Sequence, residues 1–304
     1  MHVAIAGSSG LIGSALVIEL EAAGHRVMRL VRPDTAGEGI SWDPAAGSID
    51  ASALEGVDAV INLAGRSIGE RRWSKREKRL LVDSRLDSTA LLAETVASMA
   101  TPPSVLLNAS AIGIYGDRGD QELDESSPPG SGFLADLTAR WEAATQPATA
   151  AGVRVVHLRT GIVLSTQGGA LGRMLAPFGP RWLSPFRWGL GGRVGNGRQV
   201  WSWISLTDQV RAIVHLLTSE LDGPVNLTGP APVTNRDFTK ALGSALRRPT
   251  VLWIPGFVLK LVLGSELANA LVLDSARVLP ARLLADGFEF HHTHVTDGLA
   301  AALA

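Results

Sequence analysis

One short segment, VAIAGSSGLIG at residues 3–13, constrains the fold of this chain more than any other. Its first residues form an apolar run that ends in glycine, which is typical of a strand buried on both faces. Residues 14–23 carry leucines and alanines at helical spacing, and Gly24 is a natural helix stop. HRVMRLV at 25–31 predicts a second strand. A strand, a glycine turn, a helix and a strand within about thirty residues predict a βαβ unit.

The glycine turn itself indicates a phosphate-bearing ligand. Gly7 allows the tight turn, Gly10 lets the backbone approach a pyrophosphate, and Gly13 lets the helix pack close to its strand. The anion then lies on the free N–H groups of the helix N-terminus. A turn that serves only the fold is the alternative. The sequence predicts a dinucleotide site made of Gly7, Ser8, Ser9, Gly10, Leu11, Ile12 and Gly13.

The end of the second strand decides which dinucleotide we expect. An NAD site usually places Asp or Glu about 20 residues after the glycines, where it holds the ribose 2′-hydroxyl. In this chain the strand ends at Val31 and is followed by Arg32 and Pro33. The planar guanidinium of arginine binds phosphate through two hydrogen bonds, so Arg32 suits the 2′-phosphate of NADP. We therefore expect NADP (NADPH) in preference to NAD, with a solvated surface arginine as the alternative.

Three more apolar runs read as buried strands: DAVINLAG at 58–65, SVLLNASAIG at 104–113 and VRVVHLRTGIVL at 153–164. Helical patterns at 71–99 and 133–152 separate them. Alternating strands and helices predict an α/β fold, a doubly wound parallel sheet of the Rossmann type with right-handed crossovers. The ligand of such a sheet lies across the carboxyl ends of the strands.

Several residues follow these strand ends, and we expect them to face the cofactor. They are Leu63, Ala64, Gly65, Asn108 and Ser110. Asparagine at the end of a strand is as often a turn former, so Asn108 has that alternative. Tyr115, the only tyrosine of the chain, lies in the same loop as Ser110 and is expected near the nicotinamide.

The amino-acid composition of the chain changes after residue 164. We expect residues 1–164 to form the dinucleotide-binding domain, with 200–230 returning to it, and residues 165–304 to form a smaller, mixed or α-helical substrate-side lobe that includes a helical module at 248–297. Residues 167–205 are rich in tryptophan and arginine among glycines and prolines. A cleft uses such side chains to stack on rings and hold anions.

Four residues of this segment are the candidate substrate contacts: Arg193, Arg198, Gln199 and Trp201. An exposed cap or an oligomer contact is the alternative. FGPRWLSP at 178–185 looks like an insertion without an assigned role. His291, His292 and His294 resemble a metal site, but with no cysteine and few carboxylates nearby we expect them at the surface.

The charge and composition narrow the partners. The formal net charge is −1 among 304 residues, which favours a small-molecule substrate and argues against nucleic acid. The longest apolar run, at 251–264, contains Pro255 and Lys260 and is too short to span a bilayer. The absence of cysteine suits a reducing compartment. We expect a cytoplasmic protein without a membrane partner, and the sequence makes no prediction of its oligomeric state.

The motifs together resemble a known family, the extended short-chain dehydrogenase/reductases, over nearly the whole chain. The likeness runs through GSSGLIG, NLAG, SAIGIYG and WSWISLTD at 201–208. It is strongest to a subgroup of NAD(P)-dependent epimerase-like proteins that carries a C-terminal domain of unknown function and is sometimes mislabelled as cell-division inhibitors. SWDP at 41–44, FLADLTARWE at 133–142 and RVLPARLLADGFEF at 277–290 support that subgroup.

The resemblance implies a Ser–Tyr–Lys catalytic set, and this chain departs from it. The tyrosine and lysine need to lie four residues apart on one helix. Where the family has them, this chain has Phe133, Leu134, Leu137 and Thr138, and no lysine occurs from 79 to 239. Glu142 and Trp141 on the same helix are interpreted as packing residues. The family's serine falls on Ser110 if Gly113 is counted as one extra residue, and otherwise on Ala111.

Two functions therefore stay open. In the first, the protein is an NADP(H)-dependent oxidoreductase or epimerase-like enzyme that acts on a small carbonyl or sugar-like substrate, with Tyr115 and Ser110 as catalytic residues. In the second, it is an NADP-binding regulatory or scaffold protein in which the Tyr115 ring only packs. A phenol has an ordinary pKa near 10, so the first reading requires a cation close to Tyr115.

Overall fold

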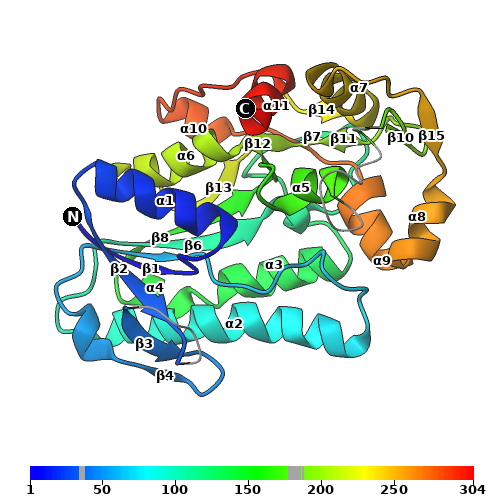
Figure 1. Cartoon of the computed structure of the whole chain (residues 1–304). Helices are drawn as coiled ribbons and strands as arrows, with labels where there is room; N and C mark the ends of the chain where they lie inside the picture. The colour runs from blue at the N-terminus through cyan, green and yellow to red at the C-terminus, as the bar shows by residue number, and fades with distance from the viewer. Residues whose placement is uncertain (34–37, 177–185, 187) are drawn as a thin grey trace.

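A computed structural model describes residues 1–33, 38–176, 186 and 188–304 of the chain. Its centre is an eight-stranded sheet in the order β13-β8-β6-β5-β1-β2-β3-β4 (Figure 1). The strands are β1 (His2–Ala6), β2 (Arg26–Val31), β3 (Ile40–Asp43), β4 (Ser48–Ile49), β5 (Ala59–Asn62), β6 (Val105–Ala111), β8 (Arg154–Thr160) and β13 (Gly223–Leu227). All neighbours pair in parallel except β3 and β4, which form an antiparallel edge.

Helices cover both faces of this sheet, as Figure 1 shows. One face carries α1 (Leu11–Ala22) and α6 (Leu206–Thr218), and the other carries α2 (Lys75–Ser98), α3 (Phe133–Ala143) and α4 (Gln146–Ala150). The central strands are buried on both faces because each face packs against helices. The predicted doubly wound α/β fold is confirmed.

Two predicted helices differ from their observed bounds for local reasons. The pattern at 133–152 forms two helices, α3 and α4, and Pro147 lies in the first turn of α4, where its missing N–H is tolerated. The pattern at 71–99 becomes α2 only from Lys75. Ser74 caps that helix, since its side chain accepts a hydrogen bond from the Glu77 N–H.

Short strand pairs and helices lie outside the central sheet. The pairs are β9 (Ile162–Leu164) with β12 (Trp203–Ser205), β10 (Gly192–Val194) with β15 (Leu252–Ile254), β11 (Val200–Trp201) with β14 (Val233–Thr234), and β7 (Glu122–Leu123) with β16 (Arg277–Val278). The helices α5 (Gly169–Leu175), α7 (Asn235–Leu246) and α11 (Val295–Leu303) pack around Trp201, Trp203 and Phe238. The predicted insertion at 178–185 lies outside the described residues.

Short helical segments complete the chain. They are η1 (Ala51–Leu54), η2 (Ile112–Tyr115), α8 (Gly256–Leu263), α9 (Ser265–Ala268), η4 (Asn269–Leu273) and α10 (Ala281–Ala285). In the part of the chain that the structure describes, no helix is long and apolar enough to cross a membrane.

One carboxylate on α6 binds the backbone of residues 291–292 near the C-terminus. Asp208 on α6 accepts hydrogen bonds from the backbone N–H groups of His291 and His292, at 2.8 and 3.0 Å. Helix α6 is capped by Ser205, whose side chain accepts from the Asp208 N–H, and not by Asp208 itself. Because it is not the cap, the Asp208 carboxylate is left available to these two N–H groups.

Candidate functional site

The glycine turn and the loop after β5 are in direct contact. Gly7 has a φ of +78°, and a Cβ there would lie 2.7 Å from the carbonyl carbon and oxygen of Leu63. A Cβ at Gly13 would lie 2.2 Å from the Gly7 oxygen. Packing therefore explains these two glycines. A Cβ at Gly10 would meet only the Gly7 oxygen, at 3.3 Å.

Gly10 has a different reason to be glycine. Apart from its two chain neighbours, no side chain of the described residues lies within 4 Å of a Cβ at Gly10, so protein packing alone requires much less of this position than of Gly7 or Gly13. The exposed backbone of Gly10 precedes α1, whose first N–H groups point toward the turn. A cradle of this form accepts a pyrophosphate. The residues present fit a dinucleotide.

Arg32 lies at the carboxyl ends of the strands, where the glycine turn also lies. It directly follows β2, and Leu30 of β2 pairs in register with Ala6, the last residue of β1. Its side chain is exposed and has no hydrogen bond or ion pair within the described ranges. The guanidinium is therefore available to a phosphate group. Residues 63–65 follow the carboxyl end of β5 and lie at the same end of the sheet.

A buried polar layer joins the ends of β5 and β6. The Asn62 amide nitrogen donates to Asn108 Oδ1 at 2.8 Å and to Thr89 Oγ1 at 3.1 Å. Trp141 Nε1 donates to the same threonine oxygen at 2.9 Å. The Asn62 side-chain oxygen accepts from the Ala64 N–H and so shapes the loop after β5. Nothing in the sequence distinguishes Asn62 as a site residue, although it lies in the NLAG motif.

The expected role of Asn108 needs correction. Its side chain is fully buried and its amide groups bond to Asn62, Thr89 and the Ala109 carbonyl oxygen. A side chain engaged in this way joins strands and does not face a ligand. The direction of its Cβ on β6, toward α2, could only be known once the helices were placed.

A second network lies at the ends of β6 and β8. Ser110 Oγ donates to Glu142 Oε1 at 2.6 Å. The guanidinium of Arg159 donates to both Glu142 oxygens, through Nε at 2.8 Å and Nη2 at 2.9 Å. Arg159 Nη1 also donates to the Tyr115 hydroxyl at 2.9 Å, and that hydroxyl donates to Asn226 Oδ1 at 2.8 Å. Glu142, interpreted from sequence as packing, is the centre of this network.

The network determines the protonation states of Tyr115 and Glu142. Burial raises the pKa of the Tyr115 phenol, and the charge of Arg159 offsets this only in part. Burial also acts to raise the pKa of Glu142, but the hydrogen bonds and charge of Arg159 outweigh it and hold that pKa below its ordinary value. Glu142 is therefore ionised at neutral pH, and the Tyr115 phenol is protonated.

This geometry bears on the two readings of Tyr115. Its side chain is 0% exposed, and both hydrogen-bonding directions of its hydroxyl are used within the protein. This burial and bonding favour a packing role for Tyr115 over proton transfer to a substrate. Ser110 is 4% exposed and its hydroxyl proton is directed to Glu142, so the serine oxygen can only accept from a ligand.

Replacing Tyr115 with phenylalanine gives a direct check. We expect the free energy of unfolding to fall by about 1–3 kcal/mol, because Asn226 Oδ1 and one Arg159 N–H lose their buried partner. Chemical denaturation of Tyr115→Phe and wild type measures this loss. A variant with unchanged stability would show that the hydroxyl is not held as the structure describes.

The four candidate substrate contacts do not converge on the strand ends. Gln199 is buried and its amide donates to the carbonyl oxygens of Val194 and Val272. Trp201 is buried against Phe238, with ring centroids 5.1 Å apart. The expectation that these two bind substrate is therefore corrected, because both side chains are buried and hydrogen-bonded to backbone oxygens of the protein. Arg198 is exposed, and Arg193 donates to the Asn196 carbonyl oxygen.

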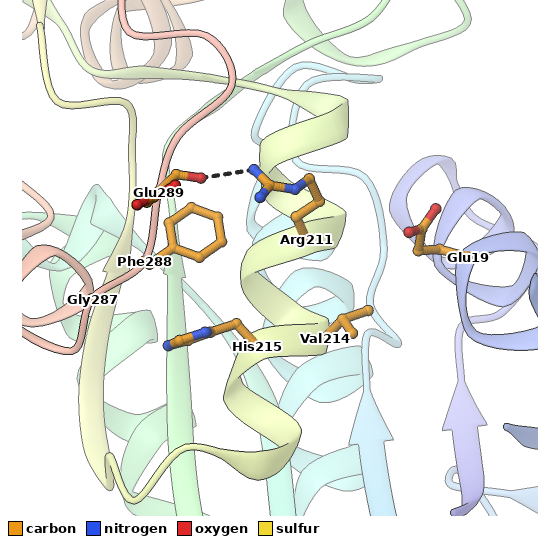
Figure 2. Close-up of a pocket in the computed structure, with 7 residues that line it drawn as sticks. All are labelled: Glu19, Arg211, Val214, His215, Gly287, Phe288 and Glu289. Carbon is orange, nitrogen blue, oxygen red and sulfur yellow. Dashed lines mark hydrogen bonds between the residues drawn. The ribbon is translucent and has the colours of Figure 1, made fainter. Parts of the chain in front are cut away.

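A pocket of about 420 Å³ lies elsewhere, between α1, α6 and residues 287–289 (Figure 2). Glu19 borders it more than two helical turns after Leu11, the first residue of α1. Arg211 of α6 donates to the Glu289 carbonyl oxygen, and its guanidinium lies 5.3 Å from the Phe288 ring. His215 and Asp286 are 2.7 Å apart at the neighbouring turn. These contacts hold the C-terminal residues against α6.

Family models match both parts of the chain. Residues 254–302 match a domain of unknown function, DUF1731, and residues 3–227 match the NAD dependent epimerase/dehydratase family. This chain belongs to the NAD dependent epimerase/dehydratase family. The family match covers β1 to β13, and with them the glycine turn and both polar networks. The resemblance noted from the sequence motifs is confirmed.

Similar proteins of this family extend over the whole chain. An epimerase family protein of Mycobacterium leprae is 47% identical over 302 residues, which cover 99% of this chain and 95% of that protein. The crystal structure of human epimerase family protein SDR39U1 with NADPH has a TM-score of 0.89 at 34% identity and covers 99% of both chains. A nucleoside-diphosphate sugar epimerase from Corynebacterium glutamicum has a TM-score of 0.80 at 34% identity, over 100% of this chain and 58% of the other.

Proposed function

We propose that this protein binds NADP(H) and acts as an oxidoreductase or epimerase-like enzyme on a small carbonyl or sugar-like substrate in the cytoplasm. The observation that carries the proposal is the open backbone at Gly10, between two glycines that packing requires. The NADPH in the similar human structure supports the choice of dinucleotide. Residues 1–164 with 200–230 would hold the cofactor, and residues 165–304 would supply the substrate side.

The chain's own residues suggest how the ligands are held. The N–H groups at the start of α1 bind the pyrophosphate, Arg32 binds the 2′-phosphate, and residues 63–65 cover the cofactor from β5. Bound NADP(H) would supply hydride transfer at its nicotinamide. Ser110 accepts a hydrogen bond from a substrate hydroxyl, because Glu142 holds its own proton. Glu142, kept ionised by Arg159, orients that serine.

The choice of NADP over NAD has its own test. Arg32→Ala should weaken NADPH binding by about 10- to 100-fold, since a charge-assisted hydrogen bond contributes about 1.5–3 kcal/mol. NADH binding should change little, because NADH has no 2′-phosphate. Calorimetric titration with each dinucleotide measures the two affinities.

Arg26→Ala is the matched control for this test. Arg26 is an exposed arginine at the opposite end of the same strand, β2. It should leave both affinities unchanged. If Arg32→Ala keeps the wild-type ratio of NADPH to NADH affinity, Arg32 does not bind the 2′-phosphate.

The regulatory or scaffold reading is supported by one specific observation. The helix α3 carries no Tyr–Lys pair, and Tyr115 is fully buried. Incubating the protein with NADPH deuterated at C4 and a panel of small carbonyl compounds and nucleotide sugars separates the two functions. Transfer of deuterium to any compound supports the enzyme. Tight NADPH binding with no transfer to any of them, and no epimer formed from any nucleotide sugar with NADP⁺, would favour the regulatory protein.

A further inference from the structure

The helix α8 exposes an apolar face to solvent. Phe257 and Leu261 are 70% and 75% exposed, and Val258 and Val262 are exposed beside them. The spacing of four residues within each pair places all four side chains on one face of the helix. An amphipathic helix of a globular protein normally buries such a face against the core. Figure 1 shows α8 at the outer rim of the molecule, beyond α5 and α9.

The residues that precede this helix are also apolar and exposed. They are Val251, Leu252 and Trp253, at the start of β15. The Trp253 ring is held at the surface, since its Nε1 donates to the Gly195 carbonyl oxygen at 2.8 Å. A concentration of large exposed apolar side chains marks an interaction site, because a chain that stays alone in water rarely keeps one.

A cluster of arginines adjoins the apolar face of α8. Arg72 joins the two, because its guanidinium donates to the carbonyl oxygen of Val262, at 2.8 Å, and to that of Leu261. Arg72 also borders a pocket of about 450 Å³ at the start of α2. Four arginines and one carboxylate line this arginine pocket: Arg66, Arg71, Arg72, Arg76 and Glu77. An apolar face and a cationic pocket therefore lie side by side.

Much of the positive charge in the arginine pocket has no partner in the protein. Glu77 pairs with Arg66, whose Nε lies 2.7 Å from Glu77 Oε1. Arg71 and Arg76 are exposed and make no hydrogen bond or ion pair within the described ranges. Residues 70–76 contain four cations and a single carboxylate, Glu70. Free guanidinium groups bind phosphate oxygens strongly, so the pocket is available to phosphate groups.

Two kinds of occupant fit an exposed apolar helix, and charge separates them. A second copy of this chain would meet the same face through twofold symmetry, so Lys260 of α8 and the nearby Arg72 would approach their own counterparts. Like charges brought together in this way oppose association. A bilayer of anionic lipids offers acyl chains to the apolar face and phosphate groups to the arginines. Its chemistry is complementary to both parts of the surface.

We propose that α8 and the arginine pocket dock this protein onto the surface of an anionic phospholipid membrane. Phe257 and Leu261 enter the interfacial region, and Arg71 and Arg76 bind lipid phosphates. Lys260, exposed on the same helix, reaches the headgroups. The run at 251–264 is too short to span a bilayer, but a helix that lies in the interface needs no such length. The expectation of no membrane partner is then wrong.

The test is co-sedimentation of the full chain with vesicles of equal parts phosphatidylglycerol and phosphatidylcholine, and with vesicles of phosphatidylcholine alone. We expect strong partition only into the anionic vesicles, weakened by added salt because salt screens the headgroup contacts. Phe257→Gln with Leu261→Gln should lower this partition at least tenfold, because two apolar side chains no longer leave water. Arg71→Gln with Arg76→Gln should lower it about 10- to 30-fold, the usual contribution of two basic residues near an anionic surface.

Each double variant has a matched control elsewhere on the protein. Ile18→Gln replaces an apolar side chain of α1 that is 70% exposed, as Phe257 is. Arg26→Gln with Arg29→Gln makes the same change of net charge at exposed positions of β2. Both controls should keep the wild-type partition. If Phe257→Gln with Leu261→Gln does not fold, Leu261→Gln alone replaces it.

Three results would overturn the proposal. The first is wild-type protein that stays in solution with both kinds of vesicle. The second is partition that only the arginine variant reduces, since the pocket would then bind an anion without the apolar face. The third comes from size-exclusion chromatography: a dimer that Phe257→Gln with Leu261→Gln converts to a monomer would show that a second copy covers α8.

Discussion

Arg159→Met is expected to lower the free energy of unfolding by about 3–5 kcal/mol, the usual cost of removing one partner of a buried ion pair. Arg159 and Glu142 have side chains that are 8% and 11% exposed, and Arg159 is the only arginine among the described residues that bonds to that carboxylate. Without it, Glu142 is left as a buried charge, and Tyr115 loses a hydrogen bond. Chemical denaturation monitored by circular dichroism measures the difference.

Two further variants show whether the loss comes from the unpaired carboxylate. Arg140→Met removes an exposed ion pair with Asp136, 3.8 Å long, on the same helix as Glu142, and should cost less than about 1 kcal/mol. Adding Glu142→Gln to Arg159→Met removes the stranded charge and should recover part of the loss. A single Arg159 variant as stable as the Arg140 variant would mean that the network contributes little.

Gly7→Ala is expected to weaken NADPH binding at least tenfold, which corresponds to about 1.4 kcal/mol. The new Cβ would lie 2.7 Å from the Leu63 backbone at a φ of +78°, so the glycine turn and the loop after β5 must separate. Because both segments border the cofactor in the proposed function, their displacement acts directly on its site. Calorimetric titration with NADPH measures the change.

Gly56→Ala is a close control for this variant. Gly56 has a φ of +79°, nearly that of Gly7, but nothing lies within 4 Å of a Cβ at that position. Both variants therefore carry the same backbone cost, and only Gly7→Ala adds the collision. We expect Gly56→Ala to lose some stability and to keep its NADPH affinity. Equal affinities in the two variants would contradict a cofactor site at this turn.

The sequence alone determined the parts of this protein that depend on neighbouring residues. Three local patterns are the spacing of Gly7, Gly10 and Gly13, the apolar runs of the strands and the periodicity of the helices. They predicted the doubly wound sheet and that its loops meet at the carboxyl ends of the strands. Thr234 caps α7 by accepting a hydrogen bond from the Asp237 N–H three residues later. Such features have local causes, because backbone conformation and periodicity are fixed over a few residues.

Only the tertiary structure decided which side chains meet. Ser110 and Glu142 are 32 residues apart, and Tyr115 and Asn226 are 111 apart, so no spacing rule joins them. Asn108 and Gln199 looked like ligand contacts, but their side chains are hydrogen-bonded inside the protein. A side chain's partners depend on how separate elements pack, and burial then sets whether its hydrogen bonds go to protein or to ligand.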